Sequence, residues 1–313
     1  MNSAKCGYFD LNRSPRQTRT ILRVQGPDAP RFLQGVLSAD IHHIDPNTAA
    51  AACLLSAKGK VISEVIVVPE GSFYLLVIPH EIAPQTMETL QRFIIMDDVE
   101  VIEEQEQGAV WFSIDPHDMN LPVSQSWRDL HFARTRHPAP GYLTIGSKKY
   151  LQNLEKSNLE RFDSIHWQRI RIESASPEWG REIVADRFPP ECGFAYSVSY
   201  NKGCFIGQEP LARIHARGQV NWVLVQVESD YRPPIELVEQ HVPIALTSAT
   251  REQAGNWTSW AYDDNLCNKT IGLAVVHRSL ASKNTVLSVV DSPNHDVVVQ
   301  SNPLGDDPGI RKN

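Results

Sequence analysis

The strongest constraint on the fold is a run of β-branched residues at Lys60–Val68. A turn sequence follows at Pro69–Ser72, and a second apolar run at Phe73–Ile78 then returns, so the segment predicts a β-hairpin. The first strand of this hairpin is apolar on both of its faces. Because exposed faces of strands usually carry polar residues, we expect the sheet that contains this strand to be covered on both sides.

Other helices and strands are predicted around the hairpin. A strand is expected at Thr20–Val24, and a helix is expected to begin near Asp28, whose side chain suits the N-cap position. The segments Glu81–Phe93 and Leu151–Arg161 are expected to be helical, whereas Ile165–Ile172 mixes the helical and strand periods and cannot be assigned. Shorter strands are expected at 99–102, 111–114 and 142–145.

The C-terminal part of the chain has a different pattern, in which short strands are separated by turn-rich stretches. Val220–Val227, Ile244–Thr247 and Ile271–Val276 are the clearest of these strands. A series of short strands of this kind predicts a small β-barrel or sandwich. Trp257 and Trp260 are expected to lie in a loop of this domain.

Composition excludes several classes of protein. The 313 residues include 30 basic and 37 acidic side chains, and a net charge of −7 argues against non-specific nucleic-acid binding, although local basic patches stay open. No apolar run is long enough to span a membrane or to form a signal peptide. The cysteines are odd in number and lack Cys-x-x-Cys spacing, which predicts a reducing, cytoplasmic environment without disulfides or a metal site. They are Cys6, Cys53, Cys192, Cys204 and Cys267.

The segment Lys202–Glu209 has the pattern of a functional loop around Cys204. Two glycines flank this cysteine and allow the backbone to turn tightly, and a short helix is expected to follow at Pro210–Arg217. Lys202, Arg213 and Arg217 are cations that favour a thiolate, which makes the cysteine a candidate nucleophile, redox centre or cluster ligand. The alternative is that Cys204 is a small buried apolar residue. His215 is either a base for this thiol or an ordinary residue of the helix surface.

Two carboxylates are further candidates. Glu64 lies on an apolar face of the predicted hairpin, where a charge must be paired, solvated or functional. The alternative is that it lies at a strand edge and faces water. Glu173 follows a basic and aromatic run and, by its sequence context alone, is an ordinary surface acid.

At this point a family resemblance is evident. Lys-Gly-Cys-Phe-Ile-Gly-Gln-Glu at 202–209 resembles the signature of the YgfZ-type folate-binding proteins, which are relatives of the T-protein, the aminomethyltransferase of the glycine cleavage system. Further segments that resemble this family are 32–41, 54–62, 171–180, 189–193 and 271–276. Together these matches span nearly the whole chain.

The resemblance implies an α+β fold in which three domains form a ring around a central, folate-sized channel. Residues 1–217 would form the folate-binding region of two interleaved α+β domains, 218–300 the C-terminal β-barrel, and 301–313 a flexible tail. The cofactor implied is tetrahydrofolate or a one-carbon derivative. Glu173 would bind the polar edge of its pterin ring, with Glu64 as a second contact.

The resemblance also implies two activities. Ser63 and Glu64 stand where the T-protein has an acidic pair, and the loss of one acid weighs against classical aminomethyl transfer. The cysteine motif instead implies the branch that supports the making or repair of iron–sulfur clusters in client enzymes, with Cys204 as an essential thiol. Lys202, Arg213 and Arg217 are candidates to hold the folate glutamate tail, to dock an acidic partner, or to be simply solvated.

Three functions therefore stay open from the sequence. The first is a folate-binding accessory protein for iron–sulfur enzymes, and the second is a folate-dependent one-carbon transferase with Cys204 and Glu64 as catalytic residues. The third is a pure binding module in which the folate site is degenerate. A monomer is expected in each case, with no nucleic-acid or membrane partner.

Overall fold

The computed structural model describes residues 7–12, 18–113, 132–151, 154–155, 157, 159–218, 220–234, 236–237, 242–263 and 269–304. The chain divides into two compact units. The first unit comprises Met1–Ser56, Ile62–Trp167 and Ser199–Ile206, and the second comprises Ala57–Val61, Gln168–Val198 and Gly207–Asn313. Both units are assembled from separate stretches of the chain. The predicted boundaries at 217 and 300 stay predictions.

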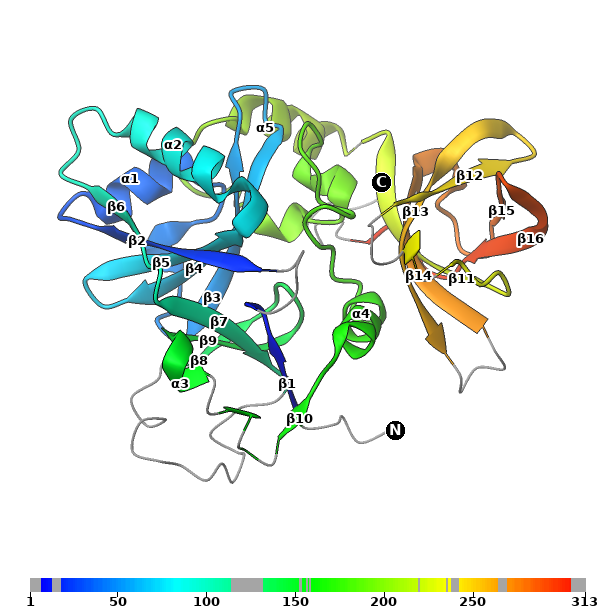
Figure 1. The fold of residues 1–313 in the computed structure, drawn as a ribbon. Coiled ribbons are helices and arrows are strands. Elements are labelled where there is room, and N and C mark those ends of the chain that lie inside the picture. The colour runs from blue at the N-terminus through cyan, green and yellow to red at the C-terminus, as the bar shows by residue number, and fades with distance from the viewer. Residues whose placement is uncertain are drawn as a thin grey trace. The chain divides into compact units, whose positions relative to one another are not determined.

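The first unit is built on a ten-stranded sheet (Figure 1). Its strands are β1 (Gly7–Asp10), β2 (Arg19–Gln25), β3 (Thr48–Leu55), β4 (Val61–Glu70), β5 (Phe73–Pro79), β6 (Glu100–Glu103), β7 (Gln107–Phe112), β8 (Phe132–Thr135), β9 (Gly141–Ser147) and β10 (Glu160–Arg161). They follow the order β10-β1-β7-β9-β8-β3-β4-β5-β2-β6. The helices are α1 (Ala29–Val36), α2 (Ala83–Phe93) and α3 (Lys148–Leu151), and short 3₁₀ turns lie at Ile41–His43 and His80–Ile82.

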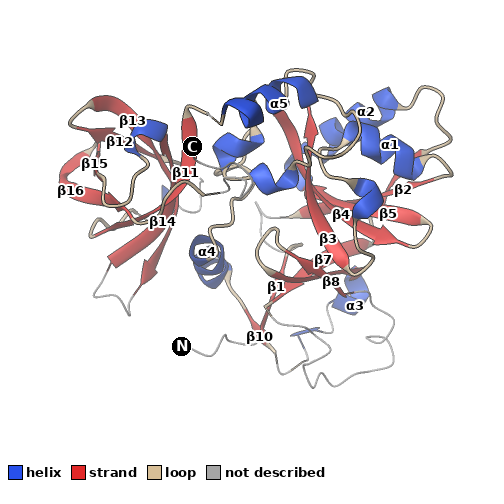
Figure 2. Cartoon of the chain, turned by 180° about the vertical axis from the view of Figure 1, so that it is seen from behind, coloured by secondary structure: helices blue, strands red, loops and turns tan. Residues whose placement is uncertain are grey.

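The hairpin predicted from the sequence is confirmed as β4 and β5, with Ile66 opposite Val77. The helices α1 and α2 cover one face of β2, β4 and β5 (Figure 2). Phe32 and Leu33 of α1 pack there in one buried apolar cluster with Val65 and other strand residues. The residues on both faces of β4 are largely buried, as its apolar pattern predicts.

The second unit contains a closed six-stranded barrel in the order β11-β14-β13-β12-β15-β16. Its strands are β11 (Trp222–Ser229), β12 (Ile244–Ser248), β13 (Arg251–Asp263), β14 (Lys269–His277), β15 (Val286–Val289) and β16 (Ser292–Val299). Helix α5 (Gln208–Arg217) precedes the barrel, and 3₁₀ turns lie at Pro189–Cys192, Ala195–Ser197 and Arg278–Leu280. The expected C-terminal barrel is thus confirmed, and none of the helices described is long and apolar enough to cross a membrane.

Three local expectations need correction or completion. Trp257 and Trp260 do not lie in a loop: both are buried in β13, where their rings meet edge to face at 6.0 Å. The helix expected at Leu151–Arg161 is wrong, because α3 ends at Leu151 and β10 forms at Glu160–Arg161. The unassigned segment at 165–172 lies in helix α4 (Ser164–Glu173).

Residues 301–304, the beginning of the segment expected to be a flexible tail, form hydrogen bonds with strand β11. Ser301 Oγ accepts a hydrogen bond from Gln226 N at 2.9 Å, and Leu304 N donates one to Leu224 O at 2.8 Å. Residues 305–313 lie outside the described residues, as do Cys6 and Cys267.

Candidate functional site

The segment Ser199–Ile206, here called the cysteine loop, belongs to the first unit together with helix α1. Two backbone hydrogen bonds attach its ends to α1 and the residues after it. Ser199 N donates to Ser38 O at 2.9 Å, and Ile206 N donates to Gly35 O at 3.0 Å. Ser38 is itself buried. The loop is therefore held at both ends, with Cys204 between the two attachments.

Lys202 provides a third attachment of the cysteine loop. Its Nζ donates to Leu37 O at 2.7 Å and to Ala39 O at 2.5 Å, and it lies 5.0 Å from the ring centroid of Phe205. These two hydrogen bonds use two of the three donors of the ammonium group. Burial lowers the pKa of Lys202 to about 8, although the charge of Asp40 acts in the opposite direction. In this arrangement Lys202 fixes the loop, which was not foreseen from the sequence.

The thiol of Cys204 is exposed, in contrast to the buried Cys53 and Cys192. Burial raises the pKa of the Cys192 thiol to about 12, which keeps it protonated and unreactive near neutral pH. Cys204 is thus the one exposed thiol among the residues that the structure describes. The alternative that it is a small buried apolar residue is wrong.

The two glycines beside Cys204 differ in their roles. Gly207 has a φ of 80°, a left-handed conformation that favours glycine at the start of α5. Gly203 does not have a positive φ of this kind, and a Cβ added there would meet no atom within 4 Å. The fold therefore does not require glycine at position 203. The small residue leaves the surface next to the thiol open.

Arg213 and Arg217 are exposed residues of α5, and Gly218 ends that helix with a φ of 63° as predicted. Cys204 belongs to the first unit and α5 to the second. The influence of Arg213, Arg217 and His215 on the thiol therefore stays a prediction, as does a role of the two arginines in holding the folate tail.

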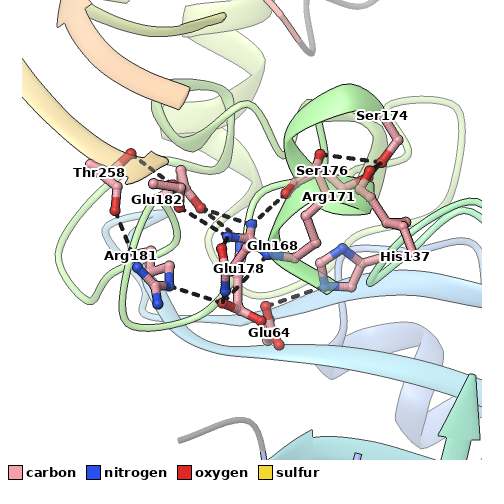
Figure 3. Close-up of polar contacts among 12 residues, drawn as sticks. Glu64, His137, Gln168, Arg171, Ser174, Ser176, Glu178, Arg181, Glu182 and Thr258 are labelled. Carbon is pink, nitrogen blue, oxygen red and sulfur yellow. Dashed lines mark hydrogen bonds and ion pairs between the residues drawn. The ribbon is translucent and has the colours of Figure 1, made fainter. Parts of the chain in front are cut away.

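Glu64 lies inside the first unit and is fully buried (Figure 3). Its Oε1 forms an ion pair with Arg19 Nη1, and its Oε2 lies 3.2 Å from His137 Nε2. Burial alone would raise the pKa of Glu64, but the charges of Arg19 and His137 outweigh it and the pKa is lowered. The alternative of a strand-edge acid facing water is wrong.

This pairing limits what Glu64 can do. Each carboxylate oxygen has a protein partner, and the side chain has no exposed surface through which a ligand could reach it. Arg19 Nε, also buried, has no hydrogen-bond partner among the described residues. A direct role of Glu64 in catalysis or folate contact stays a prediction that would require this ion pair to open.

Glu173 is the last residue of α4 and belongs to the second unit. Its side chain is 52% exposed, and its Oε1 accepts a hydrogen bond from Arg169 Nε at 2.7 Å. Among the described residues, Oε2 has no hydrogen-bond partner. This carboxylate can therefore accept hydrogen bonds from a ligand, and pterin rings present N–H donors, so the group fits the role implied for it.

A buried polar network in the second unit was missed by the sequence reasoning (Figure 3). Fully buried Arg171 donates from Nη2 to Gln168 Oε1 at 2.6 Å and to Ser259 Oγ at 2.9 Å. Its Nη1 donates to Glu182 Oε2 at 3.3 Å, and its Nε lies 3.5 Å from Glu178 Oε2. Since Ser259 lies in β13, the network connects the end of α4 to the barrel.

Arg181 and Thr258 also belong to this buried polar network. Arg181 Nε donates to Glu178 Oε2 at 3.1 Å, while Thr258 and Ser259 both donate to Glu182 Oε1, at 2.7 and 2.6 Å. The available sequence signal was the density of charged residues in 171–182, and the part at 171–180 also resembles a family segment. Within the described part of the chain, no group of three or more His, Cys, Asp or Glu residues is arranged to hold a metal ion.

Comparison with solved structures identifies the class of fold. The glycine cleavage system aminomethyltransferase T from Bartonella henselae aligns with a TM-score of 0.77 at 16% identity, covering 97% of this chain and 87% of that protein. The chain thus has the α+β fold of the aminomethyltransferase T-protein, with a closed C-terminal barrel.

Sequence comparison then shows which proteins the chain is similar to along its sequence. The chain is 25% identical over 236 residues to the tRNA-modifying protein YgfZ of Blochmanniella pennsylvanica, covering 68% of this chain and 71% of the relative. It is 23% identical over 222 residues to the mitochondrial iron–sulfur cluster assembly factor IBA57 homolog of Neurospora crassa, covering 65% of this chain and 50% of that protein. No family model matches. The expected similarity to YgfZ-type proteins and to the T-protein is confirmed.

The Lys202 attachment can be tested by Lys202→Met. We expect the substitution to lower the free energy of unfolding by about 1–3 kcal/mol, because it leaves the carbonyls of buried Leu37 and Ala39 without their donor. The exchange of the Ser199 and Ile206 amide hydrogens should become faster. Urea unfolding and hydrogen exchange measure both effects, and Lys149→Met, at an exposed lysine of the same unit, is the control.

The pH dependence of stability provides a second measurement on the same variant. The pKa of Lys202 is about 8 in the folded chain and about 10.5 in the unfolded chain. Between these values the unfolded state binds more protons, so the contribution of Lys202 to stability should increase as the pH rises from about 8. Lys202→Met should remove this increase. A pH profile and exchange rates identical to those of the native chain would contradict the assigned contact.

Proposed function

We propose that this chain is a tetrahydrofolate-binding accessory protein that supports the assembly or repair of iron–sulfur enzymes, with Cys204 as its essential thiol. The observation that carries the proposal is the exposure of Cys204 on a loop attached at three points. A fixed backbone with an exposed thiol presents a reactive group to another molecule. None of the three attachments involves the thiol, so the thiol is not needed to hold the loop in place.

The similarities support the proposal from two sides. One relative bears the name of an iron–sulfur cluster assembly factor, and another that of a tRNA-modifying protein. Both names would apply to a protein that assists an iron–sulfur enzyme that itself modifies tRNA. The T-protein fold is compatible with the folate site that the resemblance of the sequence implies. Tetrahydrofolate, when bound, can carry a one-carbon unit. In this proposal Glu173 of the chain recognises the folate, and Cys204 supplies a thiol that acts separately from folate binding.

The general test is complementation. Expression of this chain in cells that lack their native protein of this type should restore the activity of the affected iron–sulfur enzymes. Equal activity with and without the chain, at confirmed expression, would argue against the accessory role.

Folate binding is tested separately by Glu173→Gln. The variant keeps the size of the side chain but loses its charge, so we expect the affinity for tetrahydrofolate to fall by about 10-fold or more. Calorimetric titration measures the dissociation constant. Glu252→Gln, at another exposed acid of the second unit, is the control and should bind as the native chain does. An unchanged affinity in Glu173→Gln would remove Glu173 from the site.

A one-carbon transferase is the second candidate, favoured by the T-protein fold. Against it stands the arrangement of Glu64, whose oxygens are both occupied by Arg19 and His137. Turnover assays with tetrahydrofolate and an aminomethyl or methyl donor separate the two candidates. Tight folate binding without turnover supports the accessory protein.

A further inference from the structure

Trp222 begins β11 on the outer surface of the barrel. Val223 and Val225 pack in the apolar interior of the barrel, whereas Trp222 packs at the border of a different cluster that contains Leu224 and Ile172. This alternation is that of a strand with one face inward and one outward. The indole is only partly buried, so part of it is accessible from solvent.

Cationic and aromatic side chains gather around this indole. The guanidinium carbons of Arg187 and Arg251 lie 5.8 and 6.0 Å from the centroid of the Trp222 ring. His277, the partner of Trp222 across the β11–β14 pair, meets the ring edge-on at 5.7 Å. All four residues belong to the second unit, and they come from three strands and one loop.

The charge of this group is not compensated. Among the described residues, neither Arg187 nor Arg251 has a carboxylate partner, and the same holds for Arg278, which follows His277. Other arginines of the second unit are paired: Arg169 with Glu173, and Arg171 and Arg181 with Glu178. Guanidinium groups without a carboxylate partner therefore gather around one indole and form a local basic patch in a chain whose net charge is −7.

We propose that Trp222, Arg187 and Arg251 form a binding site for single-stranded nucleic acid on the barrel. The indole and the planar guanidinium groups offer surfaces on which a base stacks, and the arginine charges bind the phosphates. An acidic peptide would use the arginines but gains nothing from the indole. The net charge of the chain argues against non-specific binding over its whole surface, but it does not oppose a site with a local positive charge.

The test uses the full chain and a fluorescein-labelled, single-stranded oligouridine RNA of twelve nucleotides, followed by fluorescence anisotropy. We expect Trp222→Leu to weaken binding by about 10-fold or more, because a base loses its stacking partner. Arg251→Gln should weaken binding and reduce the slope of log affinity against log salt by about 0.7. Lys283→Gln, at an exposed lysine of the second unit, is the matched control and should leave the affinity unchanged.

Further measurements make the outcome decisive. Circular dichroism of each variant must show a native barrel, and Trp222→Phe, which keeps an aromatic face, should retain most of the affinity. Polyglutamate should compete poorly with the RNA. The proposal is overturned if the native chain does not bind the RNA, if Trp222→Leu binds as well as the native chain, or if polyglutamate competes equally. Tetrahydrofolate affinity should be the same in Trp222→Leu, which separates this site from the proposed folate function.

Discussion

Replacing Cys204 with alanine is expected to abolish the ability of this chain to restore iron–sulfur enzyme activity in cells that lack their native protein. The physical reason is that Cys204 is the one exposed thiol among the described residues, and neither buried cysteine can replace it. Enzyme activity should fall to the level of cells without the chain, a loss of at least about 10-fold if a thiolate performs the reaction. The activity is measured in extracts at matched expression levels.

Cys53→Ala is the control for this experiment. Cys53 is fully buried, so its replacement should lower the free energy of unfolding by about 1 kcal/mol but leave the rescue intact. Gly203→Ala tests the approach of a partner, because a Cβ at position 203 meets no atom of this chain. Unchanged stability together with reduced rescue would indicate that another molecule contacts the open surface beside the thiol.

Arg171→Met should have the largest effect on stability. The substitution removes the ion pair of the buried Glu182 carboxylate and one of the two cations beside buried Glu178, which keeps Arg181. Breaking a buried pair in this way typically costs about 3–5 kcal/mol. The loss is measured by urea unfolding, followed by circular dichroism. Arg169→Met, two residues earlier in the same helix, removes the surface ion pair with Glu173 and should cost less than about 1 kcal/mol.

A milder variant covers the case in which Arg171→Met does not fold. Ser259→Ala removes one acceptor of Arg171 and one donor to Glu182, so we expect a loss of about 1–3 kcal/mol. If Arg171→Met unfolds with the same midpoint as Arg169→Met, the network does not stabilise the second unit as its contacts indicate.

The elements of the fold that could be predicted are those whose signal is local. The β4–β5 hairpin follows from a run of β-branched residues and an adjacent turn, and α5 follows from Gly218 and the early Pro210. The barrel strands were recognised because short apolar runs alternate with turns. The helix expected at Leu151–Arg161 was wrong, because helical spacing of apolar residues does not reveal that a segment pairs with a distant strand, as β10 does with β1.

The candidate site was predictable only in part. The motif identified Cys204 as its centre, but its attachments lie far away in sequence: Lys202 binds the carbonyl of Leu37, 165 positions earlier. Arg171 and Ser259 are likewise 88 positions apart. Glu64 was recognised as an anomalous charge, yet its partners Arg19 and His137 come from other strands and loops, which no spacing rule connects. Contacts of this kind depend on the tertiary fold.

The central claim is that Cys204 serves a function beyond folate binding, in a protein that binds folate through other residues. The most direct measurement compares Cys204→Ser with the native chain in two assays: calorimetric titration with tetrahydrofolate, and rescue of iron–sulfur enzyme activity in cells lacking their native protein. We predict an unchanged dissociation constant and a loss of rescue. Full rescue by Cys204→Ser would contradict the claim, and so would a loss of rescue that is explained by lost folate binding.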